Sequence, residues 1–106
     1  MFLVIWEYKI KPGSEEEFEK SYGKHGEWVK FFSSSKDYLG TELIKATDVS
    51  RSYITIDRWT SEEAYINYLE KKREKYEELD DQCTALTEFE TKIGWFNTID
   101  DQGNTD

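Results

Sequence analysis

The stretch that decides the fold is YITIDRWTSEEAY, which spans residues 53–65. Its first seven residues are rich in β-branched and aromatic side chains, which favour a strand. A serine then follows, a residue type common at helix N-termini, with two glutamates directly after it. The segment therefore predicts a strand over residues 52–59 that runs into a helix starting near Thr60 or Ser61. It also places Trp59 at the junction, beside an acid (Asp57) and a base (Arg58). Successive strand residues point to opposite faces, so we expect Asp57 to share the helix side with Thr55 and Trp59, and Arg58 to lie on the other face.

The flanking sequence completes a pattern of four strands and two helices. Apolar alternation predicts the other strands, and apolar residues at spacings of three and four predict the helices. The expected strands are residues 1–10, 38–46, 52–59 and 85–96, and the expected helices are residues 14–32 and 60–83. This βαββαβ order indicates a ferredoxin-like α+β fold, with a four-stranded antiparallel sheet and two helices on one face. Residues 1–96 form the single expected domain, and residues 97–106 are a polar tail.

The first predicted helix carries mixed signals. Ser14 and Glu17 have the spacing of a capping box at its start. Gly23 and Gly26 lie inside it, which indicates a kink, a local break or a close backbone approach. His25 lies on the same helical stripe as the apolar residues.

Two further expectations concern later elements. The charged run of residues 70–81 contains opposite charges at helical spacings and predicts a solvated helix face. Simple alternation along the last strand places Phe89, Ile93 and Trp95 on one face of the sheet.

The sheet face away from the helices is also apolar, because Leu3, Ile5, Ile54 and Ile56 share it in the predicted register. Large apolar patches are uncommon on monomers, so another surface is expected to cover this face. The simplest cover is a second copy packed sheet against sheet about a two-fold axis. The sequence therefore predicts a homodimer.

Composition narrows the function classes. The chain has 106 residues and a net charge of −9, from 23 acidic and 14 basic residues. Such a surface repels phosphate backbones, so nucleic acid is not an expected partner. No apolar run reaches the roughly 18 residues of a membrane span, and no segment resembles a signal peptide, so we expect a cytoplasmic protein. A single cysteine and a single histidine predict neither a disulfide nor a metal site.

These residues also carry a family resemblance over roughly residues 2–96. The chain resembles the antibiotic biosynthesis monooxygenase superfamily of dimeric α/β barrels, through its Pro12-Gly13 turn, Phe18, Gly40, and the DRW sequence (57–59) before SEEAY (61–65). The resemblance implies a homodimeric barrel with a pocket between the sheet and the helices. It implies a cofactor-independent monooxygenase that oxidises a small aromatic or polycyclic substrate with O2. The substrate would supply the electrons, and the protein would help to form its anion.

The haem-degrading members of that superfamily are a poorer match. Their pattern requires a histidine on the second helix, where this chain has Tyr68 and Leu69. It also requires an asparagine on the first strand, where Trp6 and Glu7 stand. The resemblance therefore implies no haem and no other cofactor.

Seven residues are the resulting candidates for the site. His25, Tyr22 and Asp57 are the candidate catalytic groups, and Trp59, Tyr68, Thr55 and Trp6 are the candidate substrate-binding groups. Each has a structural alternative, since central aromatics and a lone histidine commonly serve packing. The competing function is a non-catalytic module that binds a small ligand in the same pocket.

Overall fold

The computed structural model describes residues 1–99, in which the four strands lie close to their expected positions and each of the two expected helices is divided into two. The strands are β1 (Phe2–Ile10), β2 (Tyr38–Lys45), β3 (Ser52–Trp59) and β4 (Thr87–Asn97). The helices are α1 (Glu15–Tyr22), α2 (Glu27–Phe32), α3 (Glu62–Lys71) and α4 (Arg73–Thr84). The predicted tail lies largely in residues 100–106, outside the described residues.

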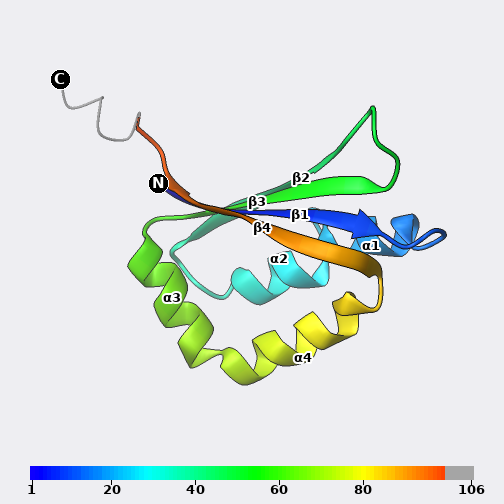
Figure 1. Ribbon diagram of the computed structural model, residues 1–106. Helices are drawn as coiled ribbons and strands as arrows, with labels where there is room; N and C mark the ends of the chain where they lie inside the picture. Colours follow the sequence, from blue (N-terminus) through cyan, green and yellow to red (C-terminus); the bar gives the residue numbers. More distant parts are fainter. Residues whose placement is uncertain (100–106) are drawn as a thin grey trace.

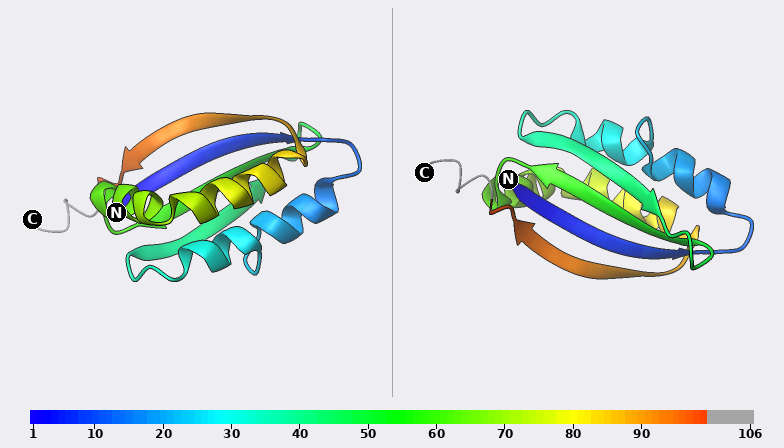
Figure 2. Two further views of the ribbon diagram at one scale, coloured as in Figure 1. Left: turned by 90° about the horizontal axis from the view of Figure 1, so that it is seen from below. Right: turned by 90° about the horizontal axis from the view of Figure 1, so that it is seen from above.

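The strands form one antiparallel sheet in the order β2-β3-β1-β4, with β1 and β3 in the centre. All four helices lie on the same face of this sheet (Figure 1), and the opposite views from below and above in Figure 2 show them covering that face alone. The ferredoxin-like α+β prediction is confirmed. Among residues 1–99, no helix combines the length and the apolar composition that a membrane crossing requires.

The first predicted helix is two helices, because the chain leaves the helical path between Gly23 and Gly26. Both glycines approach the preceding turn closely: a Cβ on Gly26 would lie 2.2 Å from the Ser21 carbonyl oxygen. Ser14 is the N-cap residue of α1, but its side chain makes no capping hydrogen bond. The predicted capping box is therefore absent, and the Glu15 carboxylate instead accepts from the Gly13 amide at 3.1 Å.

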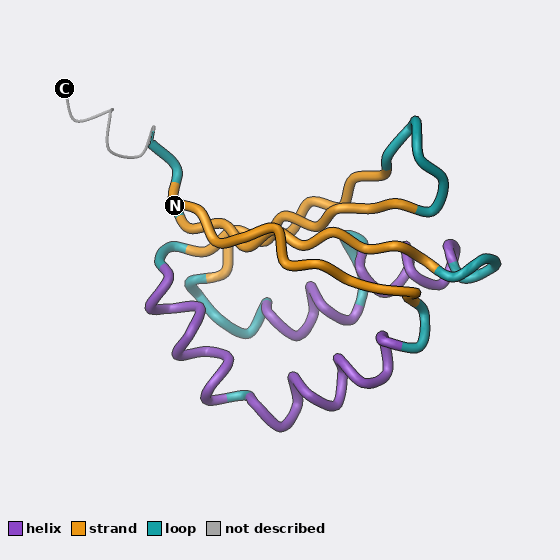
Figure 3. Tube along the Cα trace, in the orientation of Figure 1, coloured by secondary structure: helices purple, strands orange, loops and turns teal. Residues whose placement is uncertain are grey.

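The second predicted helix also divides, at Lys72, whose φ of −112° and ψ of 24° are not helical. The resulting α3 and α4 meet at an angle, so that together they curve under the sheet (Figure 3). The start of α3 agrees with the sequence, since the Ser61 hydroxyl accepts from the Ala64 amide at 3.1 Å. The break gives α4 its own orientation toward the sheet.

The core lies between the sheet and the helices and consists mainly of rings. Its fully buried large side chains are Trp59, Tyr53, Phe2, Phe18, Ile10 and Val4. Alternation explains which strand residues point inward: even-numbered residues of β1 and odd-numbered residues of β3 face the helices. The aromatic side chains therefore provide the burial that a chain of low hydrophobic content needs.

In β4 the predicted alternation is wrong. The β1–β4 register shifts between Ile5 and Trp6, where one extra β4 residue stands opposite β1. This bulge changes the parity, so Trp95 packs on the helix side against Phe2, with ring centroids 5.7 Å apart. Phe89, before the bulge, is 56% exposed and belongs to the opposite face.

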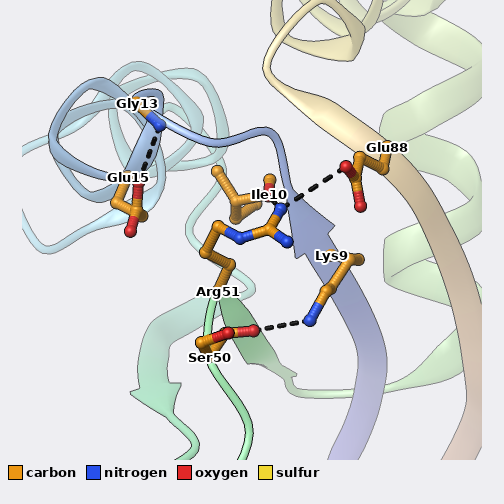
Figure 4. Close-up of polar contacts among 7 residues, drawn as sticks. All are labelled: Lys9, Ile10, Gly13, Glu15, Ser50, Arg51 and Glu88. Atoms are coloured by element: carbon orange, nitrogen blue, oxygen red, sulfur yellow. Dashed lines mark hydrogen bonds and ion pairs between the residues drawn. The ribbon is translucent and has the colours of Figure 1, made fainter.

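Arg51 ties three strands together at one end of the sheet (Figure 4). It has a φ of 60°, in the left-handed region that turns require. Its guanidinium donates to the Ile10 carbonyl at 2.5 Å and pairs with Glu88 at 3.4 Å. The Lys9 ammonium also donates to the Ser50 carbonyl at 2.6 Å. The β2–β3 hairpin is thereby held to the end of β1 and the start of β4.

Candidate functional site

A cavity of about 120 Å³ lies between the sheet and the helices. Seven of its lining residues are aromatic: Trp6, Tyr8, Tyr22, Trp28, Phe32, Tyr65 and Tyr76. The other five are polar or acidic: Thr41, Thr55, Asp57, Asp80 and Glu90. Every helix and strand of the described chain contributes at least one of these side chains.

Asp57 is the most deeply placed of the three acids. It lies on β3 opposite Thr41 of β2, and the Thr41 hydroxyl donates to its carboxylate at 2.5 Å. The hydroxyls of Thr41 and Tyr38 lie 2.5 Å apart and continue this chain of hydrogen bonds. Burial raises the pKa of the Asp57 carboxyl to about 6, although the Thr41 hydrogen bond acts in the opposite direction. The carboxylate can therefore gain and lose a proton near neutral pH.

Asp80 and Glu90 form a second acidic group, where α4 packs beside β4. Burial raises the pKa of both carboxyls, and the charge of Asp80 raises that of Glu90 further. Within residues 1–99, no ion pair includes Asp57, Asp80 or Glu90. The acids of the cavity thus have no basic side chain as a partner.

Four tyrosines supply most of the remaining polar groups. Burial is the main cause that raises the pKa of Tyr8, Tyr22 and Tyr65, and it raises that of Tyr76 to about 12. These phenols therefore stay protonated at neutral pH and can donate as well as accept hydrogen bonds. The Thr55 hydroxyl donates to the Tyr8 oxygen at 3.4 Å, a long and weak contact.

The structure brings four of the seven predicted site residues to the cavity. Tyr22 and Asp57, two of the candidate catalytic groups, both line it. So do Thr55 and Trp6, two of the candidate substrate-binding groups. The strand alternation that placed Asp57 on the helix side, opposite in direction to Arg58, is confirmed. Arg58 lies on the other face and pairs with Glu42 at 3.1 Å.

Three predicted residues lie outside the lining. Trp59 is completely buried and packs its ring against Tyr38 and Tyr65, with centroids 5.3 and 5.4 Å away. The Tyr68 hydroxyl donates to the Phe31 carbonyl and so closes the layer beneath the cavity. His25 is exposed in the turn between α1 and α2, because the glycines end the helix that would have directed it inward.

Sequence reasoning missed several lining residues. Among them, Asp80 had a signal in the sequence that could have identified it. It follows Tyr76 by four residues on one side of α4, which was a usable signal of an inward position. The prediction of a solvated face for residues 70–81 is wrong at this residue, which lines the cavity. Glu90 is opposite in parity to Phe89, but only the β1–β4 register decides which of the two faces the helices, so nothing in the sequence signalled Glu90.

Comparisons with known proteins agree with this architecture. The family model described as antibiotic biosynthesis monooxygenase matches residues 1–75, and the chain belongs to this family. No curated protein matches the chain.

Solved structures resemble the chain at low sequence identity. One is a variant of SnoaB, a cofactor-independent oxygenase from Streptomyces nogalater, with a TM-score of 0.76, 18% identity and 92% of each chain covered. An antibiotic biosynthesis monooxygenase has a TM-score of 0.70 and 17% identity, over 93% of this chain and 99% of its own. A conserved protein from Methanosarcina mazei Go1 has a TM-score of 0.68 and 11% identity, over 92% and 91%. These likenesses show the shared fold.

Proposed function

We propose that this protein is a cofactor-independent monooxygenase that oxidises a small aromatic substrate with O2 inside the cavity. The observation that carries the proposal is a buried carboxyl, Asp57, whose pKa is about 6, in an aromatic-walled cavity between sheet and helices. Family membership and the SnoaB-like fold support the reaction class.

Asp57 is the proposed general base. A base acts best when its pKa lies near the working pH, and a carboxyl at about 6 is mostly ionised at pH 7 yet can accept a proton. It would remove a proton from the substrate, whose electron-rich anion then reduces O2. For a ring CH2 group, the overall balance is CH2 plus O2 giving C=O plus H2O. The Thr41 hydroxyl would hold the carboxylate in place through the hydrogen bond that it donates.

The cavity volume bears on the size of the substrate. About 120 Å³ is close to the roughly 150 Å³ of an engineered cavity that binds one benzene. A single ring fits inside, and further rings of a polycyclic substrate would extend out of the cavity. The protonated tyrosines would donate to ring oxygens, and the Trp6 and Trp28 rings would contact the substrate faces.

The second candidate is a binding module without catalysis. It is favoured by one observation: the cavity lining contains no histidine, since His25 lies outside it. Such a module would bind the ring in the same aromatic walls and return it unchanged.

Oxygen consumption with a panel of anthrones and quinols distinguishes the two functions, with the spontaneous rate subtracted. For the monooxygenase we expect kcat/KM to rise as pH increases through about 6, because Asp57 must be ionised. Asp57→Asn should lower kcat by about 100-fold or more, the range of general base catalysis, and remove this pH dependence.

Asp48→Asn is the matched control, because Asp48 is exposed and lies outside the cavity. It should leave kcat and the pH profile unchanged. Saturable binding across the panel with no oxygen uptake would instead establish the binding module.

A further inference from the structure

The charge inside the cavity is unbalanced. Three carboxyl groups line it, and its lining contains no lysine, arginine or histidine. Burial raises the pKa of all three, which is the response of acids that lack a nearby cation. Residues 1–99 also contain no group of three or more His, Cys, Asp and Glu side chains arranged to hold a metal ion. The acids are therefore not placed as a metal ligand set.

The walls of the cavity suit an organic cation. Four tyrosines and two tryptophans line it, and the faces of such rings attract ammonium groups, most strongly where water is excluded. A second observation concerns Trp28, which is 8% exposed. Its indole Nε1 is buried with no hydrogen-bond partner in the described chain. Leaving such a donor unpaired costs free energy, and a ligand in the cavity that Trp28 lines could supply an acceptor for it.

The two acidic groups lie at different places along the sheet. In the register, Asp57 stands beside Val4 of β1, and Glu90 stands beside Tyr8. Four residues of strand separate these positions, or about 13 Å. Asp80 belongs with Glu90, whose pKa it raises. The cavity thus has one acidic end at Asp57 and another at the Asp80–Glu90 pair.

The negative charge of the cavity would oppose the proposed reaction of a neutral substrate. Loss of a proton to Asp57 would create a substrate anion near two other carboxylates, which would repel it. A positive charge carried by the substrate itself removes that repulsion, because the ionised substrate is then a zwitterion.

We propose that the ligand of this cavity is a hydroxylated aromatic amine, with its ammonium group between Asp80 and Glu90 and its hydroxyl toward Asp57. The inference rests on the proposed function in two respects, which are the cavity as the substrate site and Asp57 as the base. Binding of the ammonium group by Asp80 and Glu90 determines which ligands bind, and the hydroxyl group transfers a proton to Asp57.

The test compares two probes of the same shape and different charge. (4-Hydroxyphenyl)trimethylammonium is a permanent cation, and 4-tert-butylphenol is its neutral isostere. Isothermal titration calorimetry at pH 8 should show the cation binding at least about 10-fold more tightly, a difference of about 1.4 kcal/mol. In the double variant Asp80→Asn/Glu90→Gln, this ratio should fall below about threefold.

The control is Asp48→Asn/Glu77→Gln, which makes the same chemical changes at exposed positions outside the cavity lining. It should retain the full preference for the cation. Equal or tighter binding of the neutral phenol, or a ratio that the Asp80/Glu90 variant leaves unchanged, would overturn the inference.

The two proposals fail separately in these assays. Cation-selective binding without oxygen uptake for any panel member would support the ligand class and reject the monooxygenase. Oxygen uptake that depends on Asp57, with neutral phenols preferred over their amine analogues, would support the monooxygenase and reject the ligand class.

Discussion

Asp57 is an interior acid whose pKa lies near neutral pH because burial disfavours its charged form. Burial raises its pKa from 3.8 to about 6, so the folded protein binds this proton more tightly than the unfolded chain does. As pH rises through the interval from about 4 to 6, the folded state must hold an ionised carboxylate in the cavity. Stability therefore falls over that interval.

Replacing this acid should therefore stabilise the protein. At pH 8, Asp57→Asn should increase the free energy of unfolding by about 2–3 kcal/mol, since one pKa unit corresponds to about 1.4 kcal/mol. The amide oxygen can still accept from Thr41, so the hydrogen bond is retained. The gain should shrink toward zero as pH is lowered to 4, where the native carboxyl is protonated. Urea unfolding across this pH range measures both effects.

The exposed Asp48→Asn variant provides the baseline, with no gain that depends on pH. A variant at Asp57 that is less stable than the native protein at pH 8 would contradict the assignment of a destabilising buried charge. It would indicate that the ionised carboxylate is favourably solvated.

For single residues, the sequence predicted which face of a strand a side chain takes better than it predicted which other residues surround it. Alternation along β3 was enough to place Thr55 and Asp57 toward the helices, because a strand has a fixed period of two. The position of His25 depended on a helix continuing through two glycines, and that helix ends before it. The lining role of Glu90 required the β1–β4 register, which no local pattern specifies.

Among the elements, the break between α1 and α2 has a local cause in the sequence. At Gly26 the backbone lies so close to the preceding turn that a Cβ would meet the Ser21 carbonyl carbon at 2.4 Å and the Lys20 carbonyl oxygen at 2.5 Å. These are backbone atoms, which cannot rotate away as a flexible side chain could. The glycines thus allow the chain to turn and bring Trp28 to the cavity.

Adding one methyl group here should disturb that turn. Gly26→Ala should lower the free energy of unfolding by about 1–3 kcal/mol, the usual cost of overpacking. It should also weaken ligand binding, because α2 would shift with Trp28 and Phe32. Lys24→Ala, at an exposed residue of the same turn, is the control and should change neither quantity. Unaltered urea unfolding of Gly26→Ala would contradict the close approach.

Element order was predictable because each strand and helix has its own periodicity and boundary residues. The breaks and the bulge were harder to predict, since they depend on how elements pack. Gly23 and Gly26 did signal the first break. Nothing comparable marks Lys72, where the chain bends to let α4 follow the sheet. Simple alternation predicts Trp95 and Phe89 on the same face, but the extra residue in β4 places them on opposite faces.

For the whole molecule, the face of the sheet opposite the helices remains open. Leu3, Ile5, Ile54 and Ile56 are only partly covered there, and Phe89 and Phe96 extend the apolar surface with 56% and 43% exposure. Figure 2 shows that no helix of the described chain lies over this face. We propose that a second copy covers it, as in the homodimer predicted from the sequence.

Light scattering at micromolar concentration should then give twice the chain mass of 12.6 kDa. Ile56→Glu/Phe96→Glu should give a folded monomer, because it places two charges in the middle of the apolar face. Val49→Glu, at a 49% exposed loop residue, should remain dimeric. A monomeric mass for the native chain at this concentration would reject the dimer.

All eight elements contribute to the cavity wall, so ligand binding is coupled to the global unfolding of the described chain. A molecule bound there contacts every part of the described chain, so no single element can detach without releasing it. Its binding free energy is therefore added to the global unfolding equilibrium, as about 2.7 kcal/mol at a ligand concentration 100 times Kd. In the cell, the lifetime of such a protein against proteolysis would follow the supply of its ligand.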